Sequence, residues 1–258
     1  MAELFGKKSI LVLGGVDVAK EKAFSYGIWL NPWKSVLVRY GLTHASAVIA
    51  VDNFLGLEAM KLARYDGGNI RTIPTGYDPE FWKPSGKKEP RVLMVASSPT
   101  VAHARLKGID VLLRVAHLLP NTQFEIIGIG PDVSSSFEFP SNVEHRSFIP
   151  QELLLHSYQR SKVYCQLSYR EGLPNSLCEA MLCECVPIGS NVGGIPTAIG
   201  DTGYLVDYNN DIQIAEAIQR ALASLAESGK NARNRIASHF NRSQREDALK
   251  KIISELIA

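Results

Sequence analysis

The sequence predicts an α/β protein built on parallel β-sheets that are covered by helices on both faces. Short apolar runs alternate with segments of helical periodicity from one end of the chain to the other. Apolar residues make up 45% of the 258 residues and charged residues 21%, which is typical of a globular protein and excludes a disordered one. Strict alternation favours a doubly wound sheet, because parallel strands need a crossover, usually a helix, between them.

The N-terminal part is predicted to hold three strands, and helices follow the first two. Strands are expected at residues 9–13, 47–51 and 70–73, and helices at 32–42 and 53–64. Pro32 suits a first helical turn, and Asp52 can cap the helix that follows it. So few strand–helix units fall short of a full doubly wound domain. We therefore expect an incomplete N-terminal half, from a longer gene or a truncated reading frame.

Residues 74–90 differ in composition from both flanks. They contain four prolines, two glycines and three lysines without periodicity, which predicts a linker. The predicted organisation is a partial N-terminal domain with its linker at 1–84, a second domain at 85–240, and a C-terminal helix at 241–258. That last helix is expected to pack back on the N-terminal part.

The second domain repeats the alternation and is predicted to be a complete doubly wound unit. Its expected strands are residues 92–96, 124–127, 143–149, 163–167, 186–189 and 204–206. Its expected helices are 108–119, 151–160, 176–183, 211–227 and 230–240, and a last helix is expected at 243–257.

Charge and composition exclude several classes of protein. Lys and Arg number 28 and Asp and Glu 26, so the net charge of +2 gives no case for a nucleic-acid partner. The apolar runs are far shorter than the roughly 18 residues of a membrane helix, and the first residues do not match a secretion signal. Four neighbouring cysteines without that signal indicate reduced thiols and a cytoplasmic protein.

The strongest functional signal is the loop at residues 168–179, SYREGLPNSLCE. It leaves a predicted strand at its carboxyl end, where ligands bind in sheets of this class. Gly172 allows the backbone to approach a ligand closely, and Pro174 and Asn175 fix the turn. The amides of residues 175–177, at the positive end of the helix that follows, suit a diphosphate.

Two carboxylates flank that turn. Glu171 can accept hydrogen bonds from the hydroxyls of a sugar, and Glu179 can accept them from a ribose. Each also has a structural interpretation, since Ser176-x-x-Glu179 matches a helix capping box and Glu171 alone could be a solvated loop charge. The pair together with the glycine and Pro-Asn favours a binding site.

With the residues that follow, this loop resembles glycosyltransferase family 4, a group of GT-B enzymes. The resemblance rests on Glu171-Gly172-Leu173-Pro174-Asn175, Glu179-Ala180-Met181, Pro187, Gly193-Gly194-Ile195-Pro196, Gly203-Tyr204-Leu205-Val206, Lys107-Gly108, Gly128-x-Gly130-Pro131 and Ile73-Pro74-x-Gly76-x-Asp78. It covers nearly the whole chain. It implies two Rossmann-like domains, a C-terminal one for a nucleotide-activated sugar and an N-terminal one for the acceptor.

The resemblance also implies roles for residues. Glu171 would contact the transferred sugar and Glu179 the ribose. Lys107 would neutralise the diphosphate leaving group, as expected of a fixed cation where negative charge develops. The residues implied to line the sugar and phosphate site are Gly172, Leu173, Pro174, Asn175 and Ser176.

Two departures from the family concern the predicted site. The family's arginine after the first strand of the second domain is missing near residues 96–98, and Arg105 is expected to supply that charge. A frequent active-site histidine is missing near residues 13–17, where Asp17 is the nearest polar candidate. The alternative for Asp17 is a turn aspartate after two glycines.

The resulting hypothesis is a retaining hexosyltransferase of polysaccharide biosynthesis. Its donor would be a UDP-, GDP- or ADP-sugar, and its acceptor a glycan, a lipid-linked sugar or a small molecule. The sequence has no Asp-x-Asp and no zinc-type Cys spacing, which favours transfer without a metal or cofactor. Two alternatives stay open: a truncated module that binds a sugar nucleotide without transferring the sugar, and a GT-B-fold sugar-nucleotide epimerase.

Two expectations concern larger partners. An aromatic and basic face of Trp29, Trp33, Lys34 and Arg39 fits either peripheral contact with the inner membrane surface or core packing, which Val36 and Leu37 would share. The incomplete half is expected to expose a sheet edge, which favours association.

Overall fold

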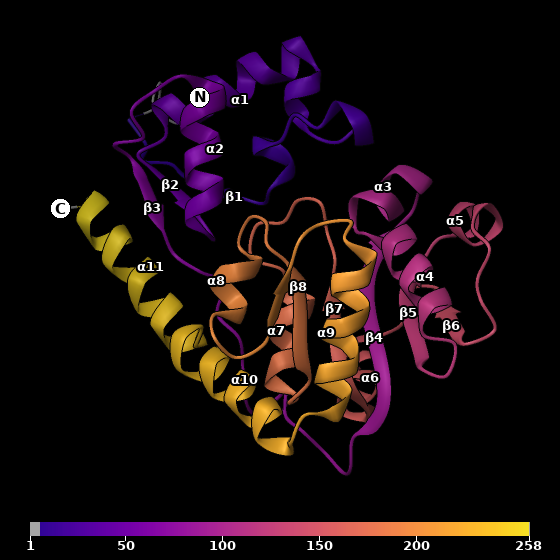
Figure 1. The fold of residues 1–258 in the computed structure, drawn as a ribbon. Helices are drawn as coiled ribbons and strands as arrows, with labels where there is room; N and C mark the ends of the chain where they lie inside the picture. The colour runs from indigo at the N-terminus through magenta and orange to yellow at the C-terminus, as the bar shows by residue number, and fades with distance from the viewer. Residues whose placement is uncertain (1–5, 258) are drawn as a thin grey trace. The chain divides into compact units, whose positions relative to one another are not determined.

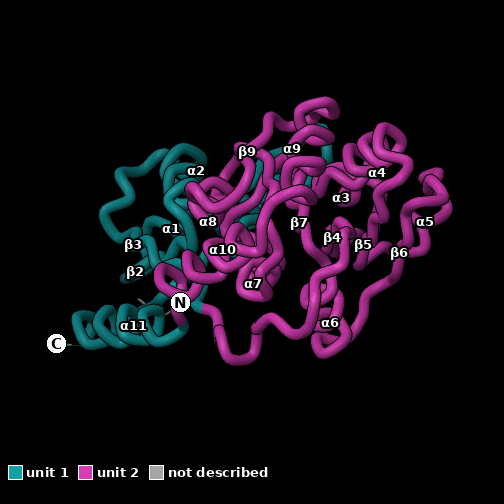
Figure 2. The backbone as a smooth tube through the Cα atoms, turned by 60° about the horizontal axis from the view of Figure 1, so that its bottom comes forward, with its two compact units in different colours: residues 1–76, 242–258 teal, residues 77–241 magenta. Residues whose placement is uncertain are grey.

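The structure, a computed structural model, describes residues 6–257 and confirms an α/β protein of parallel sheets (Figure 1). The chain divides into two compact units (Figure 2). Unit 1 comprises Met1–Gly76 and Arg242–Ala258, and unit 2 comprises Tyr77–Asn241.

Unit 1 is a three-stranded parallel sheet with helices on both faces. Its elements are β1 (Ile10–Leu13), α1 (Pro32–His44), β2 (Ala47–Ala50), α2 (Asn53–Ala63), β3 (Ile70–Thr72) and α11 (Arg242–Ile257), with 3-10 turns at Val16–Val18, Lys22–Phe24 and Ile28–Leu30. The strand order is β1-β2-β3, and the central β2 is buried along its whole length. The predicted cap of α2 is confirmed, since the Asp52 side chain accepts a hydrogen bond from the amide of Phe54.

The C-terminal helix α11 belongs to unit 1. Its Ile252 packs in a cluster with Ala47, Ile49 and Ile73. Arg245 donates hydrogen bonds to the carbonyl oxygens of Ile73 and Pro74, at 2.9 and 2.6 Å. The last helix therefore covers the face of the small sheet opposite the cluster that β2 forms with α2.

The residues predicted to form one aromatic and basic face differ in burial. Trp29 is buried and its indole nitrogen donates to the carbonyl oxygen of Asp17 at 2.7 Å. Trp33 on α1 is 84% exposed. The expected burial of Val36 and Leu37 is wrong, because α1 packs through Leu42 and Val38 instead.

Strand β1 is an edge of the small sheet. Among the described residues it pairs only with β2. Its Val12 is 54% exposed and Leu11 is also exposed, beside the exposed Leu37 of α1 in one pocket. Unit 1 therefore presents an apolar edge.

Unit 2 is a six-stranded, all-parallel sheet in the order β6-β5-β4-β7-β8-β9. Its strands are β4 (Glu89–Ser98), β5 (Gln123–Ile129), β6 (Val143–Arg146), β7 (Ser161–Gln166), β8 (Val186–Ser190) and β9 (Tyr204–Val206). Its helices are α3 (Val101–Leu106), α4 (Ile109–Leu118), α5 (Pro131–Ser136), α6 (Gln151–Arg160), α7 (Asn175–Leu182), α8 (Ile195–Ile199), α9 (Asp211–Ala223) and α10 (Ala226–His239). Helix α9 packs against α4 as well as the sheet, and α7 packs against α6 and α10.

The strand order reverses between β4 and β7. From β4 the chain proceeds to β5 and β6 on one side, and from β7 to β8 and β9 on the other. The crossovers therefore diverge there, and in sheets of this class ligands bind outside the carboxyl ends of the strands at such a point. Both ends carry residues singled out from the sequence.

The segment predicted as a linker holds two buried aromatic residues among mostly exposed ones. Tyr77 and Trp82 are buried, and the Trp82 ring meets the Tyr158 ring edge to face at 5.6 Å. Arg233 of α10 donates to the carbonyl oxygens of Pro79 and Trp82. These contacts fix the stretch against unit 2, and the boundary between the two units, after Gly76, falls inside it.

Three helices of unit 2 were not expected from the sequence. They are α3, α5 and α8, each of five or six residues. So short a helix shows too little periodicity to be detected. One of them, α3, carries Arg105 and ends directly before Lys107.

Candidate functional site

The segments that follow β4 and β7 are joined by a backbone hydrogen bond and pack closely against each other. The amide of Tyr169 donates to the carbonyl oxygen of Leu106 at 2.8 Å. Gly108 has φ +77°, and a Cβ atom there would overlap the carbonyl oxygen of Leu167. Only glycine fits such an approach in that conformation. The contact brings Lys107 next to the loop that carries Glu171.

Lys107 and Glu171 form an ion pair at the carboxyl ends of β4 and β7. Lys107 Nζ lies 2.5 Å from Glu171 Oε1, and the two side chains are 26% and 13% exposed. Two residues far apart in the sequence are thus placed together by the sheet topology. The pair is a cation and an acceptor within reach of one ligand.

The Glu171 carboxylate is oriented by three donors on one oxygen. Its Oε1 also accepts from Ser168 Oγ at 3.1 Å and from Gln166 Nε2 at 3.2 Å. The described residues offer no hydrogen bond to Oε2. That oxygen can therefore accept from a substrate hydroxyl.

Helix α7 begins where the sequence places an anion site. It starts at Asn175 with Pro174 at the N-cap position. The amides of its first turn, residues 175–177, have no acceptor within the helix, and they stand at its positive end. Tyr77 Oη donates to Asn175 Oδ1 at 2.9 Å, and Leu173 and Pro174 are buried, so the turn is held firmly.

The capping-box interpretation of Ser176 and Glu179 is wrong. No side chain caps α7, because Pro174 occupies the cap position and Ser176 lies inside the first turn. Ser176 Oγ instead donates to Gln166 Oε1 at 3.3 Å. Glu179 Oε2 accepts from Tyr158 Oη at 3.1 Å.

Glu179 is a partly buried acid. Burial raises its pKa to about 6, and the hydrogen bond from Tyr158 opposes that rise. Burial also raises the pKa of Tyr158 well above its ordinary value, so this hydroxyl stays a donor. At neutral pH the Glu179 carboxylate is ionised and can accept from a hydroxyl.

The loop that follows β8 packs against the backbone of Glu171. Gly193, after β8, has φ +55°, and a Cβ atom there would overlap the carbonyl oxygen of Glu171. The Gly194 amide approaches the same oxygen at 3.4 Å. The two glycines thus allow the loop of Glu171 to lie against the next loop.

The side chains of Arg105 and Asp17 take no part in the contacts described so far. Arg105 is exposed on α3. Burial raises the pKa of Asp110, and the charge of Arg105 is one of the smaller effects that oppose this rise. Asp17 belongs to unit 1, whereas the other predicted site residues belong to unit 2. Its carboxylate accepts from the amides of Gly14 and Gly15, at 3.2 and 2.8 Å, as a turn aspartate does.

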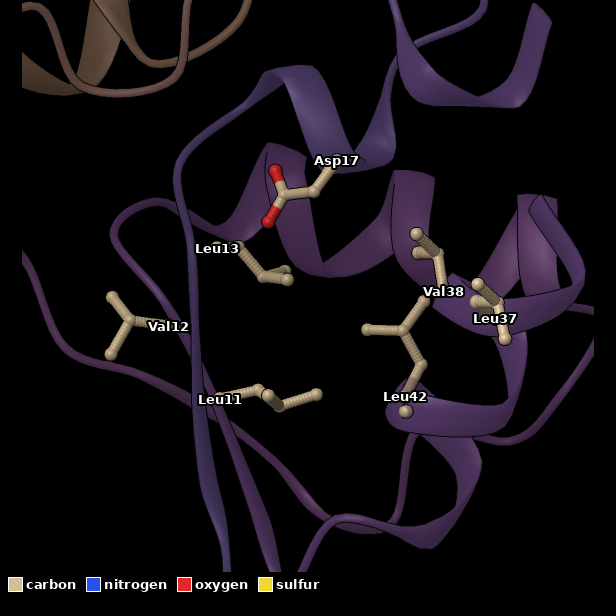
Figure 3. Close-up of a pocket in the computed structure, with 8 residues that line it drawn as sticks. Leu11, Val12, Leu13, Asp17, Leu37, Val38 and Leu42 are labelled. Carbon is tan, nitrogen blue, oxygen red and sulfur yellow. The ribbon is translucent and has the colours of Figure 1, made fainter. Parts of the chain in front are cut away.

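Asp17 also borders an apolar pocket of about 290 Å³. Figure 3 shows its carboxylate near side chains that come from β1 on one side and from α1 on the other. The lining residues are Leu11, Val12, Leu13, Asp17, Leu37, Val38, Gly41 and Leu42.

Within residues 6–257, no group of three or more His, Cys, Asp or Glu side chains is placed to hold a metal ion. In the same part of the chain, no helix is both long and apolar enough to cross a membrane. All four cysteines are free and buried.

Sequence reasoning missed the residues that orient the site. Gln166 and Ser168 hold Glu171, and Tyr158 holds Glu179. One signal was present for Gln166, a polar residue at the end of the otherwise apolar run VYCQL. The role of Tyr158 left no signal, because the contact depends on α6 packing against α7.

The sequence matches a known protein family. Residues 80–238, more than half of the chain, match the family described as glycosyl transferases group 1. One relative is the alpha-maltose-1-phosphate synthase of Mycolicibacterium smegmatis, 28% identical over 244 residues. That alignment covers 79% of this chain and 62% of the relative, so the chain spans less than two thirds of the relative's length.

Solved structures share the fold. Sucrose-phosphate synthase from Thermosynechococcus elongatus superposes with a TM-score of 0.81 at 22% identity, over 99% of this chain and 70% of that one. HepE from Anabaena, solved in complex with UDP and glucose, gives a TM-score of 0.79 at 15% identity, over 98% and 73%. The fold is that of the GT-B enzymes, as the sequence predicts.

Proposed function

We propose that this chain, which belongs to the glycosyl transferases of group 1, transfers a hexose from a nucleotide-diphosphate sugar to an acceptor hydroxyl. The donor is a UDP-, GDP- or ADP-sugar, and the acceptor is a carbohydrate, a lipid-linked sugar or a small molecule. Transfer retains the anomeric configuration and needs no metal ion. Retention rests on the resemblance of the motif around Glu171, and metal independence on the absence of Asp-x-Asp from the sequence.

One observation carries the proposal: a cation, a carboxylate and a helix N-terminus converge where the strand order reverses. The amides at the start of α7 suit the diphosphate, and Lys107, which is paired with Glu171, is proposed to share it. As the glycosidic bond weakens, negative charge develops on the diphosphate. Fixed N–H groups and a fixed cation stabilise that charge without reorganising.

The two carboxylates then have separate tasks. Glu171 uses Oε1 for its own positioning and offers Oε2 to the sugar hydroxyls. Glu179 accepts from the ribose, for which it must be ionised, as it is above about pH 6. A ligand diphosphate competes with Glu171 for Lys107, so the ion pair loosens as the donor binds.

The proposal extends to two further residues and to the location of the reaction. Asp17 stays a candidate on the acceptor side, although its carboxylate holds the turn at Gly14 and Gly15. Arg105 stays a candidate for a second positive charge near the phosphates. Free, buried cysteines are consistent with a reducing compartment, and we assign the reaction to the cytoplasm. Contact of α1 with a membrane surface is part of the same hypothesis.

Calorimetry with UDP, GDP and ADP, followed by the matching sugar nucleotides, tests the donor site. UDP is the first choice because HepE, which shares the fold, was solved with it. We expect one nucleotide to bind and its sugar to be transferred or slowly hydrolysed. Analysis of the product anomer tests retention. Absence of binding by every nucleotide would contradict the proposal.

A second candidate is a module that binds a sugar nucleotide without transferring the sugar. The observation in its favour is that Lys107, Glu171, Glu179 and the start of α7 all lie in unit 2. Donor binding therefore needs nothing from the acceptor side. Tight binding without turnover across a panel of acceptors would favour this candidate over the transferase.

A further inference from the structure

Gln166 is a buried amide at the carboxyl end of β7. It is 4% exposed, and its register partner on β8 is Gly189. A buried amide is costly unless its donors and its acceptor are all bonded. Where these bonds go therefore indicates what the residue does.

The two ends of this amide bond to two different parts of the site. Its Nε2 donates to Ser168 Oγ at 2.8 Å and to Glu171 Oε1 at 3.2 Å. Its Oε1 accepts from Tyr164 Oη at 3.1 Å and from Ser176 Oγ at 3.3 Å. The donor end thus faces the loop of Glu171, and the acceptor end faces the first turn of α7.

We infer that Gln166 is a positioning residue that fixes the Glu171 carboxylate relative to the N-terminus of α7. The inference rests on the proposed function, in which Glu171 contacts the sugar and α7 the diphosphate. Sugar and diphosphate are joined by one bond in the donor. Both contacts can therefore form together only if their separation is held constant.

The chemistry of an amide explains why glutamine occupies the position. The hydroxyl of Ser168 donates its proton toward Glu171. The backbone of Ser168 is held by a hydrogen bond from Ser190 Oγ to its carbonyl oxygen. A carboxylate in place of the amide could still accept from Ser176, but it would repel Glu171. An apolar side chain of similar volume would satisfy neither side. Only an amide donates toward one element and accepts from the other.

Gln166→Met tests the inference through two affinities. The nucleoside diphosphate measures the contacts with α7 and Lys107, and the sugar nucleotide adds the contact with Glu171. We expect the Kd for the nucleoside diphosphate to stay within about threefold of wild type, whereas the extra affinity of the sugar nucleotide is lost and turnover falls about 100-fold.

Ser161→Ala is the matched control. Ser161 lies at the other end of β7, is fully buried, and donates its hydroxyl to the carbonyl oxygen of Ser157 at 2.8 Å. The substitution removes a buried hydrogen bond from the same strand, at the end away from the site. Both affinities and turnover should stay at the wild-type level in this variant.

Two further variants separate positioning from a structural role. Gln166→Glu keeps the volume and the acceptor, so it should show the same loss as Gln166→Met, and it replaces that variant if Gln166→Met does not fold. In a Glu171→Ala background, Gln166→Met should not further change the extra affinity of the sugar nucleotide over the nucleoside diphosphate, because its effect acts through Glu171.

Three outcomes would overturn the inference. One is a Gln166→Met protein with wild-type affinities and turnover. Another is an equal loss of affinity for the nucleoside diphosphate and the sugar nucleotide, which would show that Gln166 does not act on the contact with Glu171. The third is a wild-type chain that binds neither ligand, which would overturn the proposed function as well, whereas the first two leave that function standing.

Discussion

At the scale of single residues, the site is a set of charges that satisfy one another until a ligand arrives. Lys107 and Glu171 are paired, and Glu171 is further held by Ser168 and Gln166. A partly exposed ion pair contributes little to stability. Its value is that both partners are already placed where a donor would need them.

Glu171→Ala should lower turnover by orders of magnitude while the fold survives. The carboxylate that orients the sugar is lost, but the site is open enough for solvent to reach Lys107. Steady-state kinetics together with thermal unfolding check this. Glu89→Ala is the control, because it removes an exposed carboxylate paired with Arg160 outside the site. Wild-type turnover in Glu171→Ala would contradict the site assignment.

Glu179 makes folding depend on pH. Its pKa is about 6 in the folded chain against an ordinary 4.5, so the folded state binds the proton more tightly than the unfolded one. The stabilisation is complete below about pH 4.5 and is lost as pH rises through about 6. The difference of about 1.5 pH units corresponds to about 2 kcal/mol.

Glu179→Gln should remove that dependence. The difference in free energy of unfolding between wild type and variant should fall by about 2 kcal/mol from the acid to the neutral end of this range. Urea denaturation at several pH values measures it, with the exposed Glu152→Gln as the control. The same variant should bind nucleotide more weakly at neutral pH. A flat difference across the range would show that Glu179 is not buried as described.

At the scale of elements, three loops at the carboxyl ends of β4, β7 and β8 hold the start of α7 and Glu171. Glycines permit their contacts, because backbone atoms lie where a Cβ atom would be. The helix contributes its N-terminus and the loops contribute the side chains. The precision of the site thus depends on how tightly the loops approach each other.

Gly193→Ala should displace the loop of Glu171. The new methyl group would overlap the carbonyl oxygen of Glu171, and φ is +55°. Gly86→Ala is the matched control, since Gly86 has φ +69° but open space around its Cβ position. The control should cost about 1 kcal/mol of stability and keep turnover. Gly193→Ala should cost more and lose turnover, as chemical denaturation and kinetics would show. Equal behaviour of the two variants would contradict a close-packed loop.

At the scale of the whole molecule, the two units differ in how completely their sheets are covered. The six-stranded sheet of unit 2 has helices on both faces, whereas β1 of unit 1 leaves Leu11 and Val12 exposed at an edge. An unpaired apolar edge strand is a template for pairing with another strand. Unit 1 is therefore where association is expected.

Val12→Lys should reduce self-association of the chain. We expect wild type to form dimers or larger species through the β1 edge, and a charge on that edge to oppose pairing. Light scattering after size exclusion measures the mass. Ile212→Lys, an equally exposed apolar position on α9, is the control. A monomeric wild type would contradict the prediction.

The sequence by itself determined the α/β class, most strands and long helices of both units, and the loop from Glu171 to Glu179. These depend on local periodicity and on the chemistry of neighbouring residues, which a chain displays directly. The pairing of Lys107 with Glu171, the bonds of Gln166, the burial of Trp82 and the loss of the expected helix cap were decided by tertiary structure alone. Each depends on residues distant in sequence, which meet only because the strand order places β4 beside β7 and the helices pack over them.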